Sequence, residues 1–324
     1  MRITHRITIG SDVYASPDTS RLLRLHVRAS LSEPVKYVEL VLAPPNGLSL
    51  QRGDDLKLEL GVDGASSRVF SGKIAQVEWK LDEVRVLAES SMARLTATRV
   101  NLAFEKQAAG DIVSALCKEA KVSTGNVEPG LKFPAYTVTS NQSAYDHARR
   151  LALQCGFDLY ADPEDKVTFA RPVPSGQPRV LQYGTNVLSI LVEYPNKGVG
   201  EVQVFGESPA SFGKGDDAAP WLTKKDVKSN APAAGDGDVL IRAIEPAART
   251  LQNAQQIASN LQAALQSKVC ARVRLVGNPD IRLNELIQIT RMPADQLNGT
   301  FKVIGVEHIL NPENGFVSML DLCE

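Results

Sequence analysis

The chain has 324 residues, of which 43% are hydrophobic and 23% are charged, and its formal net charge is −1. This length predicts two or three domains, and the hydrophobic content is enough for globular cores, which excludes a wholly disordered chain. The balanced charge excludes a uniformly basic protein that would be drawn to nucleic acid or to an anionic membrane.

Residues 1–100 are predicted to be mostly strand. Apolar and polar residues alternate along this segment, as at Leu56, Leu58 and Leu60, which is the period of a strand with one buried face. Turn residues such as Asp63-Gly64 separate the apolar runs. Many short strands at this spacing predict a barrel or a compact sandwich.

The apolar period becomes helical after about residue 101. A first helix is predicted after Gly110, with Asp111 favouring its start. A second helix is predicted over residues 142–154, with Ser140 or Asn141 as its N-cap. Residues 157–160 and 166–171 then indicate a hairpin. Together these elements predict a small α+β domain over residues 101–182, in which Gly156 terminates the second helix.

Strands resume near Val187, and residues 183–324 are predicted to form a second β-domain. Residues 206–238 are rich in Gly, Pro, Ser, Ala and charge, which indicates a long exposed loop with Trp221 as its large anchor. A long amphipathic helix is predicted over residues 247–266, and we expect it to pack on the second β-domain.

Two widely separated stretches share residue types at shared offsets. The first contains Arg52-Gly53-Asp54-Asp55-Leu56 and then Lys73-Ile74, and the second contains Arg282-Leu283-Asn284-Glu285-Leu286 and then Lys302-Val303. Chance similarity between two amphipathic hairpins is the alternative interpretation. Strand alternation alone, however, does not require an acidic pair before the leucine. We therefore predict a duplicated β-module, which is typical of a chain that builds an architecture rather than a single active site.

The sequence contains no constellation of residues typical of catalysis. The histidines are few and scattered, and none has a partner at metal-ligand spacing; they are His5, His26, His147 and His308. His147 and Cys155 share a predicted helix, but their spacing puts them about 12 Å apart. A nucleophile and its base need a separation of about 3 Å. We expect no catalytic, cofactor-binding or metal-binding residue, no cofactor and no enzymatic activity.

The remaining short motifs also have structural interpretations. Asp54-Asp55 marks a strand entry and Arg52-Gly53-Asp54 a turn into that strand, while Asp216-Asp217 falls in the predicted loop. Asp236-Gly237-Asp238 lacks the further oxygen ligands of a calcium loop. Gly213-Lys214-Gly215 lacks the residues and the context of a phosphate-binding loop.

The cysteines indicate folding in a reducing compartment, because they are widely spaced and form no CxxC motif; they are Cys117, Cys155, Cys270 and Cys323. The first residues lack the apolar run of a signal peptide, and no segment approaches the roughly 18 consecutive apolar residues that span a bilayer. We expect synthesis in the cytoplasm and no membrane segment.

Three groups of motifs, in their order along the chain, carry a resemblance to a known family. They are residues 72–79 with 88–95, residues 143–145 with 151–160, and residues 277–279 with 303–308 and 314–320. In this order they resemble the baseplate hub family of contractile injection systems. That family includes the late control D proteins of contractile-tailed phages, the N-terminal hub region of VgrG proteins, and the hubs of R-type pyocins and extracellular injection particles.

The resemblance implies a mainly β fold with an α+β insert. Two similar tube-forming β-barrels, over residues 1–100 and 183–324, would flank the insert of residues 101–182. It further implies a homotrimer whose six barrels form a ring, and this ring would adapt a trimeric spike to a hexameric inner tube and transmit force on contraction. The expected partners are the spike, the tube and other baseplate or wedge proteins, with no direct nucleic-acid binding.

The resemblance also implies assembly into a phage-tail-like particle, which is released on lysis or anchored in the cell. VgrG proteins continue into a spike, whereas this chain stops two residues after Leu322, so we expect any spike to be a separate polypeptide. Two other functions stay open at this point. One is a free-standing barrel module that binds glycans or proteins, and the other is a hub with a hidden cell-wall hydrolase activity.

Overall fold

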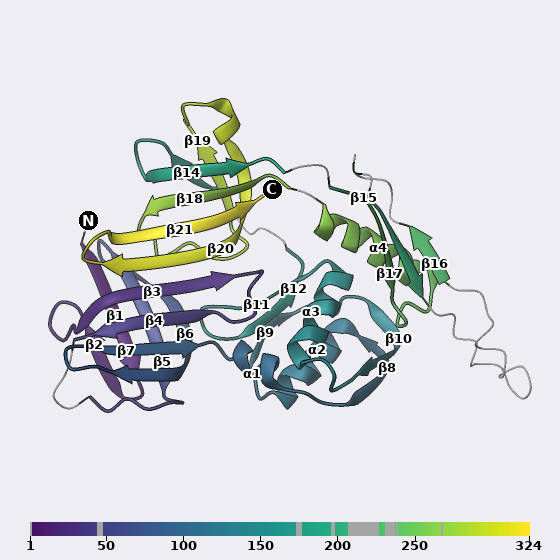
Figure 1. The fold of residues 1–324 in the computed structure, drawn as a ribbon, viewed down its shortest axis with the longest axis horizontal. Helices are drawn as coiled ribbons and strands as arrows, with labels where there is room; N and C mark the ends of the chain where they lie inside the picture. Colours follow the sequence, from purple (N-terminus) through teal and green to yellow (C-terminus); the bar gives the residue numbers. More distant parts are fainter. Residues whose placement is uncertain are drawn as a thin grey trace, which may run out of the picture.

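The structure, a computed structural model, is mainly β, as the sequence predicts. It describes residues 2–43, 48–172, 177–195, 198–206, 227–230, 237, 239–266 and 268–324. Two β-rich regions lie side by side, and a mixed region of helices and short strands lies against them (Figure 1).

The first seven strands enclose one hydrophobic core, and we call them the first barrel. They are β1 (Ile3–Ile9), β2 (Asp12–Ala15), β3 (Leu22–Ser30), β4 (Tyr37–Leu42), β5 (Asp55–Val62), β6 (Ala65–Trp79) and β7 (Val84–Glu89). Their order in the sheet is β3-β4-β7-β6-β5-β1-β2. The predicted alternation is confirmed, because Leu56, Leu58 and Leu60 are fully buried whereas Lys57 is exposed.

A second group of strands, which we call the second barrel, encloses its own core around Val273, Ile287 and Leu320. Its elements are β13 (Arg179–Gln182), β14 (Val187–Glu193), β18 (Cys270–Val276), β19 (Leu286–Thr290), the 3-10 turn η3 (Asp295–Leu297), β20 (Gly299–Asn311) and β21 (Gly315–Cys323). The order is β14-β18-β21-β20, with β19 on β20 and β13 on β19. Because β20 also pairs with β3, both barrels share one 13-stranded sheet.

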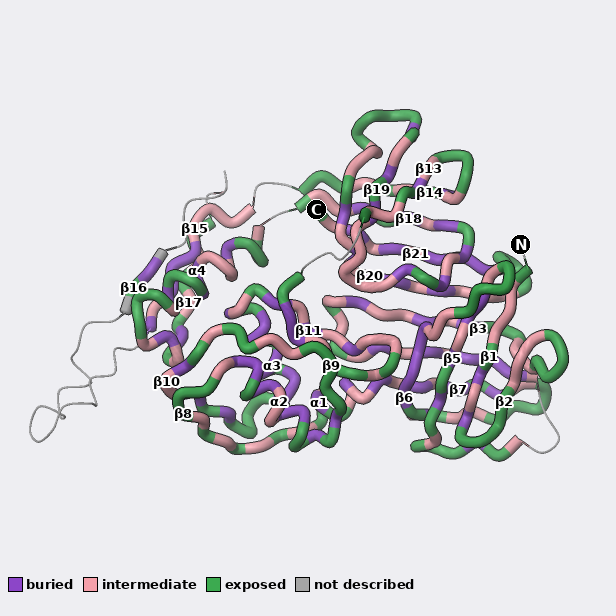
Figure 2. Tube along the Cα trace, turned by 180° about the vertical axis from the view of Figure 1, so that it is seen from behind, coloured by how far each residue is buried: buried purple, intermediate pink, exposed green. Residues whose placement is uncertain are grey.

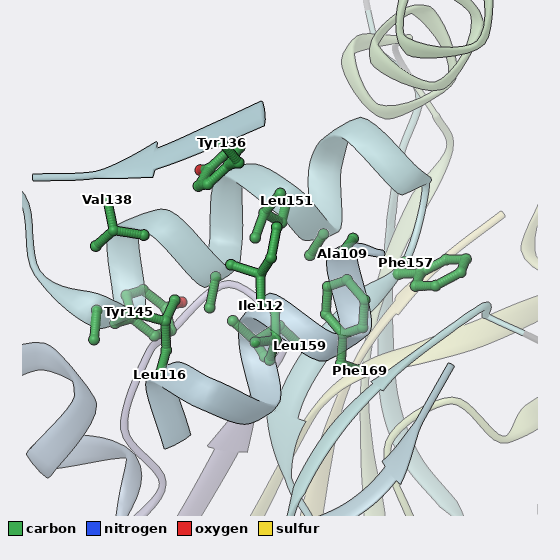
Figure 3. Packing of buried hydrophobic residues seen from close by; sticks show 14 of the residues in the cluster. Ala109, Ile112, Leu116, Tyr136, Val138, Tyr145, Leu151, Phe157, Leu159 and Phe169 are labelled. Atoms are coloured by element: carbon green, nitrogen blue, oxygen red, sulfur yellow. The ribbon is translucent and has the colours of Figure 1, made fainter. Parts of the chain in front are cut away.

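The middle part of the chain, which we call the insert, forms a third core. Its elements are α1 (Met92–Ala97), β8 (Leu102–Ala108), α2 (Ala109–Glu119), β9 (Thr124–Val127), β10 (Lys132–Val138), α3 (Ala144–Cys155), β11 (Asp158–Ala161) and β12 (Val167–Ala170). The apolar faces of α2 and α3 meet over Phe157 and Phe169 (Figure 3). The predicted helices and the hairpin of β11 and β12 are confirmed.

The N-cap of α3 differs from the predicted one. Ser143, and not Ser140 or Asn141, caps the helix, since its Oγ accepts a hydrogen bond from the backbone N–H of Asp146 at 3.1 Å. At the other end Gly156 adopts the left-handed conformation with φ 67°, which ends the helix as predicted.

The long helix α4 (Leu251–Leu265) packs on strands of residues 183–324, as predicted, but these strands form a sheet of their own and are not part of the second barrel. It covers a separate three-stranded sheet of β15 (Val199–Gly206), β16 (Val227–Asn230) and β17 (Val239–Ile244), and it packs against α3. Its buried residues Ala254, Ile257 and Ala258 belong to the insert core. The apolar stripe was predicted correctly, but β15 and α3, rather than the strands of the second barrel, supply the apolar surface that covers it.

Most of the predicted loop 206–238, with Trp221, Gly213-Lys214-Gly215 and Asp216-Asp217, lies outside the described residues. Part of its described remainder is strand, because β16 pairs with β15. The tube trace in Figure 2 shows the shared sheet with the insert and the small sheet beside it. The proposed boundaries of the three domains at residues 100 and 182 stay predictions.

Candidate assembly surface

The two barrels repeat one arrangement of five strands. The first barrel has the order β3-β4-β7-β6-β5, and the second has the order β14-β18-β21-β20 with β19 on β20. Each neighbouring pair in both sets is antiparallel. The structural repeat therefore contains the predicted module of β5, β6 and β7 and extends it by two strands in each barrel.

Matching irregularities fix the correspondence residue by residue. The β3–β4 register shifts between Leu22 and Arg24, and the β14–β18 register shifts between Val187 and Ser189. The β6–β7 register shifts between Ile74 and Gln76, and the β20–β21 register shifts between Val303 and Gly305. Because a one-residue slip would turn every side chain to the other face, these shared shifts define equivalent positions.

The turn before β5 and β19 shows that the alignment read from the sequence is one residue out of step there. Gly53 donates to the Ile74 carbonyl at 2.8 Å, and Asn284 donates to the Val303 carbonyl at 2.9 Å. Both residues have positive φ, 96° at Gly53 and 69° at Asn284. Asn284 is therefore the counterpart of Gly53, and Asn tolerates the left-handed region better than most residues.

Strand pairing between β20 and β3 joins the barrels within the chain, and we call this pairing the internal junction. Glu307 lies opposite Arg28, His308 opposite Val27, and Val306 opposite Ala29. The backbone N–H of Leu31 donates to the Ile304 carbonyl at 2.8 Å, which continues the ladder by one more bond. The two barrels are thus held together by main-chain hydrogen bonds as well as by side chains.

One face of the internal junction carries a network of charges. Arg28 contacts Glu33 at 2.9 Å, Glu307 at 3.4 Å and Asp321 at 3.8 Å, and His26 is also hydrogen-bonded to Glu307. The hydrogen bond from His26, followed by the charges of His26 and Arg28, lowers the pKa of Glu307. These half-buried contacts link β3, β20 and β21 across the join.

The opposite face of the internal junction is buried. His308 is only 3% exposed and hydrogen-bonds to Ser318 at 2.9 Å. Burial, with a smaller effect of Arg282 and Lys36, lowers its pKa to about 3, so the ring is neutral at neutral pH. His308 thus packs on the buried face of β20. A cavity of about 290 Å³ lies beside it, lined by Val27, Lys36, Tyr160 and Arg282 among others.

Two strand edges that correspond to the internal junction remain open. β14 pairs with β18, and residues 75–79 of β6 pair with β7, while neither has a strand on its other side in the described sheet. By the equivalences above, β14 corresponds to β3 and β6 corresponds to β20. The large apolar side chains along these edges are exposed; they are Trp79, Leu188, Leu191 and Tyr194.

The residues weighed as catalytic candidates have structural partners. His147 Nε2 is hydrogen-bonded to the Thr139 carbonyl at 3.1 Å, and Cys155 Sγ accepts from the Leu131 backbone N–H at 3.3 Å. His5 contacts Ser20 at 2.9 Å. Asp54 and Asp55 stand at the entry to β5, as predicted.

Among the residues that the structure describes, no group of three or more His, Cys, Asp or Glu residues could hold a metal ion. None of the described helices combines the length and the apolar character needed to cross a membrane. The site that stands out is the pair of open edges together with their closed counterpart at the internal junction.

Comparison with known proteins decides the family. The family model described as the phage tail baseplate hub matches residues 28–314. The chain belongs to this family. The family is that of a structural hub protein of the phage tail, so the resemblance read from the sequence is confirmed. No curated protein matched the chain.

Solved structures of tail proteins share the fold of this hub-family chain. A tail protein from Neisseria meningitidis MC58 has a TM-score of 0.74 and 13% identity over 100% of this chain and 97% of that one. The 43 kDa tail protein of prophage MuSo2 from Shewanella oneidensis has a TM-score of 0.68 and 13% identity over 98% and 97%. An E. coli component of the type VI secretion system has a TM-score of 0.56 and 12% identity over 99% and 76%.

Proposed function

We propose that three copies of this chain form the baseplate hub of a contractile tail-like particle. The observation that supports it is the duplicated barrel, joined within the chain by strand pairing at the internal junction. A trimeric spike cannot match a hexameric tube by symmetry alone. Three chains with two equivalent barrels each present six similar units to the tube and three identical chains to the spike.

The hub would hold the trimeric spike on one side and the hexameric inner tube on the other, with other baseplate or wedge proteins around it. Its work is to adapt the two symmetries and to transmit force on contraction, and neither task needs a catalytic step. Ring formation would also cover the open strand edges, which are otherwise sites of unwanted pairing. The chain would be made in the cytoplasm and assembled into a particle.

The oligomeric mass of the purified chain, measured by light scattering with and without the neighbouring spike protein, tests this function. We expect a trimer, or a monomer that becomes trimeric when the spike protein is added. A chain that stays monomeric with its spike and tube partners would refute the hub function. That result would favour a free-standing module that binds glycans or proteins.

A further inference from the structure

We propose that β14 of one copy pairs antiparallel with residues 75–79 of β6 in a second copy, in the register of the internal junction. The number of copies in the ring rests on the proposed function, whereas the pairing itself rests on the duplicated strands. Within one chain these two strands are seven strand steps apart in the sheet order β14-β18-β21-β20-β3-β4-β7-β6. The pairing therefore joins two molecules.

The equivalent positions give the register. The pairings with β4 and β18 equate Val27 with Val192, Arg28 with Glu193 and, one step further, Ala29 with Tyr194. The pairings with β7 and β21 equate Val77 with Val306, Glu78 with Glu307 and Trp79 with His308. Transferring the internal junction to the second copy places Val77 opposite Tyr194, Glu78 opposite Glu193 and Trp79 opposite Val192.

Burial distinguishes the closed junction from the open edges at these same positions. At the internal junction Val27 is 2% exposed and His308 is 3% exposed. Their counterparts are more exposed, since Val192 is only half-buried and Trp79 is 55% exposed. Tyr194 is 62% exposed. Val192 and Trp79 therefore stand at positions that strand pairing buries at the internal junction. With the exposed Tyr194 beside them, they form the surface that a strand of a second chain would cover.

The backbone of β14 has the donors that this register requires. The bond from Leu31 to Ile304 identifies the hydrogen-bonded pairs of the internal junction, and antiparallel pairs alternate from there. The residues of β14 that must donate to residues 75–79 are Val192, opposite Trp79, and Tyr194, opposite Val77, and each has a backbone N–H. Pro195 takes the place of Ser30, a non-hydrogen-bonded position. A proline there removes no bond between the copies.

One residue pair between the copies differs in charge from its counterpart at the internal junction, and this difference can be tested. Glu307 faces Arg28 at the internal junction, whereas Glu78 would face Glu193 between copies. Like charges directly opposite each other weaken an antiparallel pair. Arg85, whose Nη1 is 3.8 Å from Glu78, offsets part of this repulsion. Glu193→Arg introduces the positive charge that Arg28 carries at the internal junction, and it should therefore strengthen the assembly.

The occupant of the edges is a second copy of this chain and not an unrelated strand. The two open edges are the two halves of a junction that the chain already makes once, and each copy carries both halves. A contact of this kind is head-to-tail, so it closes into a ring when the rotation between copies permits. Any protein strand can add to an open edge, and such binding is an outcome that the following test separates from self-pairing.

Disulfide cross-linking between mixed variants tests the register. Chains carrying Glu78→Cys are mixed with chains carrying Glu193→Cys and oxidised mildly, because the non-hydrogen-bonded pair brings side chains closest. We expect a covalent dimer that contains one chain of each kind, identified by mass spectrometry of the linked peptide. Each variant alone, and Glu78→Cys mixed with Ser189→Cys, are the matched controls and should give no such product.

The outcomes separate this proposal from the hub function. An oligomer without the Glu78–Glu193 cross-link, or with an equal yield at Ser189, overturns the strand pairing but leaves the hub function standing. A chain that remains monomeric with its partners refutes both. As a second measurement, Glu193→Arg should lower the concentration for half-assembly by about tenfold, and an unchanged or higher concentration would count against the register.

Discussion

At the scale of single residues, Cys270 and Cys323 are the thiols best placed to react with each other. They lie opposite each other on β18 and β21, with 3.7 Å between their Sγ atoms. The backbone N–H of Glu324 donates to the Val269 carbonyl, so the cysteines occupy the neighbouring non-hydrogen-bonded pair. The Cα separation at such pairs, about 4.5 Å, falls within the range that a disulfide spans.

We expect oxidised glutathione to convert these two thiols into a disulfide, with release of reduced glutathione. Burial and the neighbouring Cys270 raise the pKa of Cys323 to about 11, so the reaction should be faster at pH 9 than at pH 7. Thiol titration should show two of the four thiols lost, and the Cys270→Ser variant should keep its remaining three. The closed loop should stabilise the chain by up to about 4 kcal/mol.

Lys36 is a second residue whose ionisation should be measurable. Its side chain is buried beside the cavity of the internal junction, with its Nζ 5.6 Å from the centre of the Phe70 ring. Burial, followed by the charge of Arg282, lowers the pKa of Lys36 from 10.5 to about 8. Keeping the ammonium buried therefore costs about 3 kcal/mol below pH 8, and this cost disappears as the pH rises through 10.5.

Lys36→Met should raise the free energy of unfolding at pH 7 by up to about 3 kcal/mol, because methionine fills a similar space without a charge. At pH 9.5 the gain should fall to about 1 kcal/mol, since the native lysine is then mostly neutral. Urea unfolding at both pH values measures this difference. A gain of the same size at both values would show that packing, and not the ionisation of Lys36, is responsible.

At the scale of elements, α4 shows how far an apolar stripe can be interpreted. The spacing of its apolar residues predicted the helix and its buried face, because both follow from the helical period. The period does not say which surface covers that face. In the structure the helix also bonds to the surface that it packs on, since the side-chain amide of Asn260 donates to the Gln154 carbonyl of α3 at 2.7 Å and that of Asn253 to the Lys132 carbonyl at 2.9 Å.

Ile257→Ala in α4 should destabilise the insert by about 2 to 4 kcal/mol, because Ile257 is fully buried in the insert core. Leu251→Ala is the matched control, since Leu251 is 64% exposed on the same helix, and it should be nearly neutral. Hydrogen exchange locates the effect. Faster exchange in α3 with unchanged exchange in β18 and β21 is expected, and the reverse pattern would place α4 on the second barrel after all.

The duplicated strands show a similar limit to prediction. Alternation and the shared residue types predicted the repeat of β5, β6 and β7, because side-chain period is a local property. The one-residue offset at Asn284 was missed, since a positive φ at a residue other than glycine leaves little trace in the sequence. Nor could the internal junction be predicted, because the pairing of β3 with β20 joins distant segments whose period predicts faces and not neighbours.

At the scale of the whole molecule, the duplicated barrels give the chain one paired junction, the internal junction, and two unpaired strand edges at the equivalent positions. A single barrel has two edges to protect, and strand pairing at the internal junction already covers one edge of each barrel. The corresponding edges on β14 and on residues 75–79 of β6 are left unpaired. The charged network of Arg28 and Glu307 belongs to the closed junction alone, so ionic strength should affect the two kinds of junction differently.

Salt should therefore strengthen the assembly of the native chain. If Glu78 and Glu193 face each other between copies, raising the salt concentration from 50 to 500 mM screens their repulsion, as the Debye length falls from roughly 14 Å to 4 Å. The Glu193→Arg chain has an attractive pair at this position, so the same increase should weaken its assembly. Sedimentation at several protein concentrations measures both trends. Parallel trends in the two chains would indicate that other charges govern assembly and that this register is wrong.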